Sequence, residues 1–197
     1  MPRWSPDGSR IAFHAMVDGR FQVFVIDAAG GFDRQLTQND FNSVAPKWTP
    51  DGQFVLFESD DRGENNIWRM SAEGGRVELL MENASSPWPL ANDEWIFLRD
   101  RKLWSRKRSG ELLDLGPWSL LRWTVWRHKI VGVRRVGRAR YFAIANRETG
   151  ELEKVEEISD ELPTPATPVV SADGQWIYYM QTDIEGTDIM LAENFVP

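Results

Sequence analysis

The sequence contains no cysteine and no long apolar run, and each absence excludes a class of structure. Without cysteine in its 197 residues, the chain forms no disulfide and carries no thiol nucleophile. No apolar run approaches the roughly 18 residues that a membrane-spanning helix needs. The N-terminus also lacks the basic and apolar segments of a secretory signal. The sequence therefore predicts no membrane span and no export signal within this chain.

Motifs for catalysis are missing as well. There are only two histidines, His14 and His128. The sequence shows no Gly-x-Ser-x-Gly nucleophile elbow, no Gly-rich phosphate loop and no zinc-ligand spacing. We therefore expect the chain not to be an enzyme, with no catalytic residue, no metal and no cofactor.

Aromatic residues, in contrast, are abundant. Ten Trp and ten Phe accompany a hydrophobic share of 42% and a charged share of 27%. The two shares are ordinary for a globular protein. The many large, flat side chains favour an all-β fold in which they fill the space between sheets.

An internal repeat is the strongest signal. Residues 3–8, Arg-Trp-Ser-Pro-Asp-Gly, return at residues 47–52 as Lys-Trp-Thr-Pro-Asp-Gly. Weaker openings follow at Trp88, at Trp123 and at residues 171–174, Ser-Ala-Asp-Gly. A period of about forty residues, with several short strands in each copy, is typical of a β-propeller. A β-sandwich is the competing architecture, but it requires no strict period.

The predicted strands divide the chain into five blades of one domain, residues 1–197. The boundaries are about 1–44, 45–85, 86–117, 118–162 and 163–197. Each blade is a four-stranded antiparallel meander with short turns, but the last has about three strands. In the first blade we expect strands at 11–15, 21–27 and 34–36 after the opening Trp4. In the second we expect them at 47–48, 54–58, 66–70 and 77–80.

The repeat resembles that of TolB-like β-propellers. The resemblance rests on residues 4–13 (Trp-Ser-Pro-Asp-Gly-Ser-Arg-Ile-Ala-Phe), 23–31 and 34–37, with a second copy at 57–70. It covers the whole chain, most clearly at 1–80 and 168–192. Propellers of this kind close their ring by completing the last blade from the other terminus. The resemblance thus implies that these residues belong to a larger six- or seven-bladed parent.

The resemblance also implies a range of functions. TolB is a periplasmic partner of an outer-membrane lipoprotein in bacteria, and this favours an exported location. Similar propellers precede the hydrolase domain of prolyl oligopeptidase-type enzymes. Others follow winged-helix or kinase domains in bacteria, and residues 186–195 look like the end of that last group.

The Asp-Gly pairs have a structural interpretation. They recur in equivalent turns, where Pro fixes one dihedral angle and Gly accepts a positive φ. We therefore assign turn roles, and not metal binding, to Asp7, Gly8, Asp51, Gly52, Asp173 and Gly174. Asp60, Asp61 and Glu64 share one loop. A calcium site is conceivable there, but the pattern favours a solvated hairpin tip.

The net charge of −7 conceals a basic segment. Residues 99–140 hold 13 Lys or Arg against three acids, and the rest of the chain holds ten against 27. This balance argues against a uniform nucleic-acid-binding surface, but a local patch for an acidic peptide or polyanion fits. The alternative is that these cations pair with the chain's own acids. The candidate interaction surface comprises Trp95, Arg99, Arg101, Trp104, Arg106, Lys107, Arg108, Arg127, Arg134 and Arg135.

Together these patterns predict a non-catalytic propeller that acts as a protein-interaction or sensing module, with a protein or peptide partner. The alternative is an accessory propeller that gates substrate access to a prolyl oligopeptidase-type serine hydrolase. A metal-dependent propeller hydrolase is a third hypothesis. It needs carboxylates that converge from several blades, and the sequence shows no such set.

Overall fold

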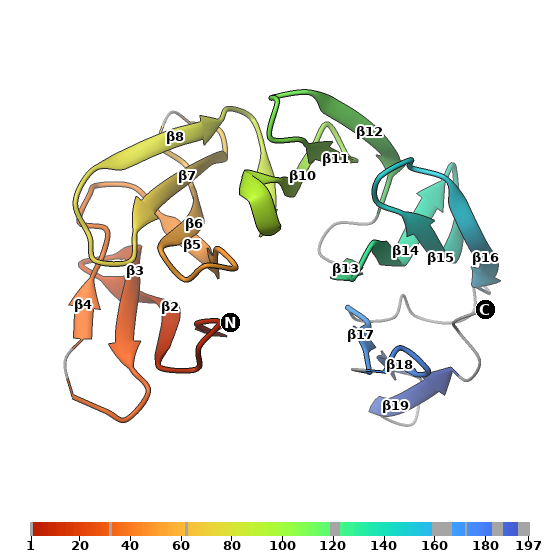
Figure 1. Cartoon of the computed structure of the whole chain (residues 1–197), viewed down its shortest axis with the longest axis horizontal. Helices are drawn as coiled ribbons and strands as arrows, with labels where there is room; N and C mark the ends of the chain where they lie inside the picture. The colour runs from red at the N-terminus through yellow and green to blue at the C-terminus, as the bar shows by residue number, and fades with distance from the viewer. Residues whose placement is uncertain are drawn as a thin grey trace. The chain divides into compact units, whose positions relative to one another are not determined.

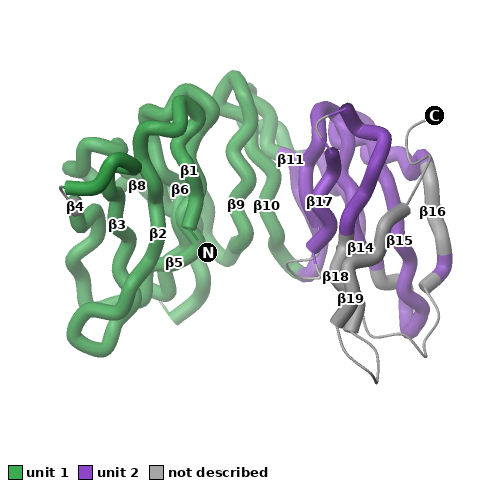
Figure 2. The backbone as a smooth tube through the Cα atoms, turned by 90° about the horizontal axis from the view of Figure 1, so that it is seen from below, with its two compact units in different colours: residues 1–100, 106–112 green, residues 101–105, 113–197 purple. Residues whose placement is uncertain are grey.

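The computed structural model describes residues 2–31, 33–61, 63–118, 123–158, 167–171, 173–182 and 187–192. Within these residues the protein is built from β-strands, and the one helical element is a short 3₁₀ turn, η1 (Ala91–Asp93). None of these residues belongs to a helix that is long and apolar enough to cross a membrane. The chain forms two compact units, residues 1–100 with 106–112 and residues 101–105 with 113–197 (Figure 2).

The first unit contains two complete four-stranded meanders, in which each strand pairs with the next in sequence (Figure 1). The first sheet comprises β1 (Arg3–Trp4), β2 (Arg10–Val17), β3 (Arg20–Asp27) and β4 (Asp33–Gln35). The second comprises β5 (Ser43–Trp48), β6 (Phe54–Ser59), β7 (Asn66–Ser71) and β8 (Val77–Met81). The unit also contains β9 (Ser85–Pro89) and β10 (Trp95–Arg99), which pair antiparallel.

The remaining strands form three further groups. β11 (Lys102–Arg106) and β12 (Leu112–Pro117) complete the third sheet, whose order is β12-β11-β10-β9. The fourth sheet comprises β13 (Trp123–Trp126), β14 (Lys129–Val136), β15 (Ala139–Asn146) and β16 (Leu152–Ile158). The fifth has three strands, β17 (Val169–Val170), β18 (Ile177–Thr182) and β19 (Thr187–Ala192).

Successive sheets in the first unit pack face to face through the first strand of the later sheet. β5 contacts β1, β2 and β3, and β9 contacts β5, β6 and β7. We call these contacts the first junction and the second junction. The first junction has an apolar core to which both sheets contribute, namely Ala12, Val23, Val25, Leu36, Trp48, Val55, Phe57, Met70 and Ala72. Because both faces of the second sheet are covered, its central strand β6 is apolar on both faces.

The second unit repeats this mode of packing. A buried cluster joins strands β14 and β15 of the fourth sheet to β17 and β18 of the fifth, and it comprises Val131, Val133, Phe142, Ile144 and Ile177, with Val170 against it. Stacking of one meander on the next, which the repeat predicts, accounts for both clusters.

The all-β fold and the antiparallel meanders are thus confirmed. The fifth sheet has three strands in the described residues, and the incomplete last blade is confirmed as well. Two strands begin earlier than predicted: β5 begins at Ser43 and β9 at Ser85, whereas the predicted openings are at residues 47–48 and at Trp88. Each of these strands contains a bulge residue with positive φ, Ala45 at 54° and Ser86 at 55°. The sequence between the predicted strands of the fourth and fifth blades, residues 159–168, is polar and rich in Pro and predicts a joint. It lies mostly outside the described residues, as do Arg62, Arg122 and the chain end from 193.

Candidate interaction cleft

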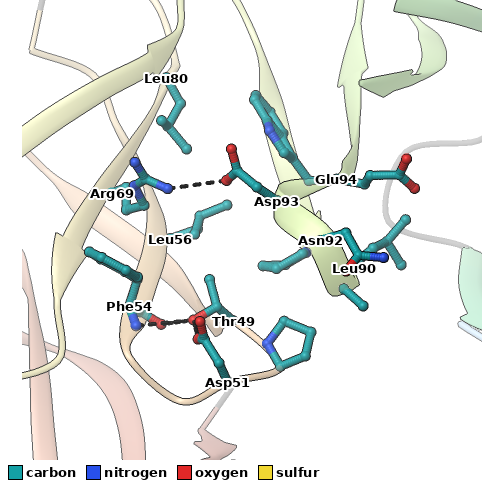
Figure 3. A pocket seen from close by; sticks show the side chains of 14 residues that line it. Thr49, Asp51, Phe54, Leu56, Arg69, Leu80, Leu90, Asn92, Asp93 and Glu94 are labelled. Carbon is teal, nitrogen blue, oxygen red and sulfur yellow. Dashed lines mark hydrogen bonds and ion pairs between the residues drawn. The ribbon is translucent and has the colours of Figure 1, made fainter. Parts of the chain in front are cut away.

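A cleft of about 450 Å³ opens at the second junction, entirely within the first unit. One wall comes from the turn before β6 and from strands β6–β8, and the other from the segment that joins β9 to β10 (Figure 3). The lining residues are Thr49, Pro50, Asp51, Phe54, Leu56, Arg69, Leu80, Pro89, Leu90, Ala91, Asn92, Asp93, Glu94 and Trp95. The side chains of Phe54, Leu56, Leu80 and Leu90 make much of this lining apolar, and the carboxylates come from the two turns.

Arg69 crosses the junction at one end of the cleft. Its Nη1 donates to Asp93 Oδ1 at 3.2 Å, and its Nη2 donates to Glu78 Oε2 at 2.7 Å (Figure 3 shows the pair with Asp93). The guanidinium carbon also lies 4.8 Å from the centroid of the Phe54 ring. Arg69 is therefore already bonded to two carboxylates and stacked on an aromatic ring.

The Asp51 wall is a turn whose geometry the sequence dictates. Asp51 Oδ1 accepts hydrogen bonds from Thr49 Oγ1 at 2.6 Å and from the Gln53 amide at 3.0 Å. These bonds, first that of Thr49, lower the pKa of Asp51, so the carboxylate is charged at neutral pH. Gly52 follows with a φ of 69°, a conformation that other residues adopt only under strain.

Equivalent turns have the same internal bonds. Asp7 Oδ1 accepts from Ser5 Oγ, and Asp173 Oδ1 accepts from Ser171 Oγ, each at 2.6 Å. The bond from Ser5, with two more from Ser9, lowers the pKa of Asp7 to about 2. In the second unit, a Cβ on Gly174 would collide with the ring of Trp126. These carboxylates thus stabilise the turns in which they lie, through hydrogen bonds to neighbouring residues of the same turn.

The opposite wall is less regular, because the third repeat replaces Asp-Gly by Asn92-Asp93. Both residues have positive φ, 62° and 57°, within the 3₁₀ turn η1. Leu90 and Glu94 close this turn, since the Leu90 amide donates to the Glu94 carbonyl at 2.8 Å. This turn places Asp93 opposite Arg69.

At each junction, a titratable side chain caps the bulge of the next sheet. His14 Nδ1 accepts from the Ala45 amide at 3.4 Å, and Glu58 Oε1 accepts from the Ser86 amide at 2.9 Å. Burial lowers the pKa of His14 and raises the pKa of Glu58. From the sequence, the position that His14 and Glu58 share is a tolerant strand end. In the structure it has a defined role in joining consecutive sheets.

Lys47 is another side chain that reaches the next sheet. Its Nζ lies 3.9 Å from the centroid of the Trp88 ring. Burial, together with the positive charge of Arg3, lowers the pKa of Lys47 to about 7. The aromatic face favours the cation, whereas the loss of water around the amine disfavours it.

The predicted basic surface is divided between the two units. Arg99, Arg106, Lys107 and Arg108 belong to the first. Arg99 donates to Met81 Sδ at 3.5 Å and lies over Phe97, whereas Arg106 lies 5.8 Å from the centroid of the buried Trp95 ring. Of these cations, Arg108 is exposed.

In the second unit, Arg127 lies 4.4 Å from the centroid of the Trp126 ring, and Lys102 lies 5.9 Å from that of Trp104. Arg134 donates to the Pro117 carbonyl at 3.0 Å, and burial lowers the pKa of its guanidinium. Arg101 is exposed, and the side chain of Arg135 lies outside the described residues. Because the set is divided between the two units, its role as one surface stays a prediction.

The acidic loop is held together by its neighbours. Asp60 accepts from the Asn42 amide at 2.8 Å and from Asn42 Nδ2 at 2.9 Å, and Asp61 accepts from Asn66 Nδ2 at 3.1 Å. Within the described part of the chain, no three His, Asp or Glu residues come together as a metal site would require.

The stacked meanders and their repeated openings define a repeat protein of the β-propeller class. The TolB β-propeller domain model matches residues 1–104, and the chain belongs to this family. No curated protein sequence matches the chain.

Solved structures show the same fold. TolB from Acinetobacter baumannii is 21% identical, with a TM-score of 0.77, and the match covers 98% of this chain and 51% of that one. The β-propeller domain of the trilobed protease from Pyrococcus furiosus, described as having an open velcro topology, is 13% identical with a TM-score of 0.67. That match covers 100% of this chain and 67% of the Pyrococcus chain. Hydrazine synthase from Kuenenia stuttgartiensis is 12% identical with a TM-score of 0.74, and the match covers 98% of this chain and 37% of the hydrazine synthase chain. The chain spans about half the length of the Acinetobacter TolB.

The cleft itself was not predicted from the sequence. Two signals indicate it in retrospect, namely the replacement of Asp-Gly by Asn92-Asp93 in the third repeat and the change from Arg10 to Phe54 at one repeat position. Neither of them points to a cleft until the sheets are placed against each other.

Proposed function

We propose that this chain is a non-catalytic interaction module, and that its cleft at the second junction binds a segment of a partner protein. The observation that carries the proposal is the cleft itself, with its apolar floor of Phe54, Leu56 and Leu80 between two carboxylate-bearing turns. An apolar cleft with a few convergent polar groups is the usual form of a binding site.

The polar groups around the cleft suit binding better than catalysis. Asp51 is bonded within its own turn, and Asp93 is paired with Arg69. A general base would need a free side chain within reach of a substrate. Of the histidines, His14 accepts a backbone amide bond at the first junction, and His128 lies in the turn between β13 and β14 in the second unit.

The test blocks the cleft without disturbing the core. Ala91 lines the cleft and is exposed, so Ala91→Trp fills the opening from its rim. Ala29, exposed in the turn after β3, provides the matched control Ala29→Trp. A phage library of random peptides is selected on the unaltered chain, and each selected peptide is then measured against both variants. We expect Ala91→Trp to abolish binding and Ala29→Trp to retain it. Peptides that bind all three proteins equally would disprove the proposal.

A second candidate function is that of an accessory propeller that gates access to a serine hydrolase. It is favoured by the similarity to the propeller domain of the Pyrococcus furiosus protease. This candidate predicts a Gly-x-Ser-x-Gly elbow encoded beside this segment in the same gene. An adjoining winged-helix, kinase or export segment would favour the interaction module instead. The exported location that the family implies is part of this proposal.

The basic surface remains a separate proposal for an acidic partner. Arg106 ends β11 and Lys107 and Arg108 follow it, and reversal of all three to Glu inverts the local charge. We expect the reversed protein to lose partners in a pull-down experiment that the unaltered protein retains. Unchanged partners would disprove a role for this surface.

A further inference from the structure

The repeat position that Phe54 occupies at the second junction is occupied by a different residue, Arg10, at the first junction. Arg10 begins β2 and Phe54 begins β6, and both accept the same backbone bond, from Ser5 at 2.8 Å and from Thr49 at 2.9 Å. The residue before each also accepts the amide of the turn after the next strand, from Ala28 and from Ala72. Arg10 and Phe54 therefore occupy one repeat position, and each faces the following sheet.

Arg10 fills the first junction with a guanidinium. The guanidinium carbon lies 5.0 Å from the centroid of the Trp48 ring, and Nη1 is 2.7 Å from Glu73 Oε1. Nη2 also lies 3.4 Å from the Gly52 carbonyl oxygen. The aromatic face, the carboxylate and the turn carbonyl of the second sheet thus form a receptor for an arginine that the first sheet supplies.

Phe54 supplies no such cation to the second junction. The cleft lining holds the carboxylates of Asp51, Asp93 and Glu94 and only one cationic side chain, Arg69. Arg69 is bonded to Asp93 and also to Glu78, which lies outside the lining. Arg106, outside the lining, also reaches this rim, where its Nη1 donates to the Asp93 carbonyl oxygen at 3.5 Å. The three carboxylates of the lining still outnumber these two cations around an apolar floor, and this arrangement is complementary to a cation with an aliphatic stem.

We infer that the cleft receives an arginine side chain of the partner protein, at the place where the chain's own Arg10 lies at the preceding junction. This inference rests on the proposed function of the cleft. The aliphatic stem lies along Phe54 and Leu56, and the guanidinium bonds to the Asp51 carboxylate, whose two turn bonds both go to Oδ1. Arginine fits better than lysine because its planar fork stacks on rings and binds carboxylates with two hydrogen bonds.

The test uses the repeat itself. Phe54→Arg places in the cleft the arginine side chain that Arg10 provides at the equivalent position of the first sheet. We therefore expect the variant to fold and its new side chain to exclude the partner. Gln53→Arg adds the same charge at an exposed neighbour outside the cleft lining and serves as the control. The probes are the selected peptides whose binding is lost in Ala91→Trp, each also synthesised with citrulline in place of arginine. Titration calorimetry on the whole chain measures every pair.

If the inference is right, these peptides contain arginine, and citrulline weakens binding by about tenfold or more. Phe54→Arg then abolishes binding, whereas Gln53→Arg does not. Asp51→Asn, which retains the turn acceptor, also weakens binding. Peptides that need the open cleft but bind equally well with citrulline would overturn the inference and leave the proposed function intact. A selection that yields no peptide sensitive to Ala91→Trp would overturn both.

Discussion

The first and second junctions use the same repeat positions, but they are closed by different interactions. At the first, Arg10 and Arg34 of one sheet both pair with Glu73 of the next, at 2.7 and 3.0 Å. At the second, Phe54 and Glu78 occupy those two positions, and the ion pair across the junction joins Arg69 to Asp93. The repeat thus fixes which positions face the next sheet, but the residue at each position in a given copy determines whether the space between the two sheets is filled or left as a cleft.

The largest expected effect is on stability, and it distinguishes Trp48, which opens the second repeat, from Trp88, which opens the third. Trp48 is 8% exposed, is part of the core of the first junction and donates its Nε1 proton to the Arg3 carbonyl at 2.9 Å. Trp48→Ala should lower the free energy of unfolding by about 3–5 kcal/mol. Trp88→Ala should cost clearly less, because Trp88 is only half-buried. Urea unfolding followed by circular dichroism measures both, and equal losses would contradict the comparison.

The next effect concerns Lys47, which lies on the Trp88 ring. Its pKa of about 7 is below the ordinary 10.5, so the unfolded chain binds more protons between these values and stability rises with pH in that window. Lys47→Met should therefore stabilise the protein at neutral pH, by on the order of 2 kcal/mol, and should flatten this rise. In the unaltered protein, Lys47 should react with acetic anhydride at pH 7 faster than Lys107. Mass spectrometry of the labelled peptides checks this, and equal rates would contradict it.

The two bulge caps should respond to pH in opposite directions. The pKa of His14 is lowered from 6.5, so stability from this group is lost as pH falls below that value, and His14→Asn should reduce the loss. The pKa of Glu58 is raised from 4.5, so stability is lost as pH rises above that value.

Glu58→Gln retains an acceptor for the Ser86 amide without the buried charge. We expect it to raise the urea midpoint at pH 7 and to leave it unchanged below pH 4.5. Midpoints measured across pH for both variants decide the matter. A Gln variant that is less stable at pH 7 would show that the charged cap is favourable.

The smallest effect concerns the ion pair of the first junction. Arg10→Ala should cost about 1 kcal/mol, because Glu73 is largely exposed and the solvent screens the pair. The loss should shrink in high salt. Phe54→Ala at the matched position should show no such dependence on salt. Unfolding in low and high salt tests the contrast, and a loss for Arg10→Ala that salt leaves unchanged would rule out an electrostatic origin.

Much of the architecture was predictable because its determinants are local. The Trp-x-Pro-Asp-Gly opening specifies a turn through the hydroxyl and carboxylate of Thr49 and Asp51 and through the positive φ of Gly52. Apolar runs such as residues 54–57 and 95–98 lie on buried strands. The bulges at Ala45 and Ser86 were not predictable, since neither residue favours positive φ and each is capped from a preceding sheet.

The sequence by itself determined the repeat, the all-β class and the family, because these depend on periodic residues and turns that are close together in the chain. Only the tertiary structure decided that Arg10 fills one junction, that Phe54 leaves the next one open, and that the basic segment is divided between two units. The physical reason is that these outcomes depend on groups from different sheets, such as Arg10 with Gly52 and Glu73, which are 42 and 63 residues further along the chain and meet it only after the sheets have packed.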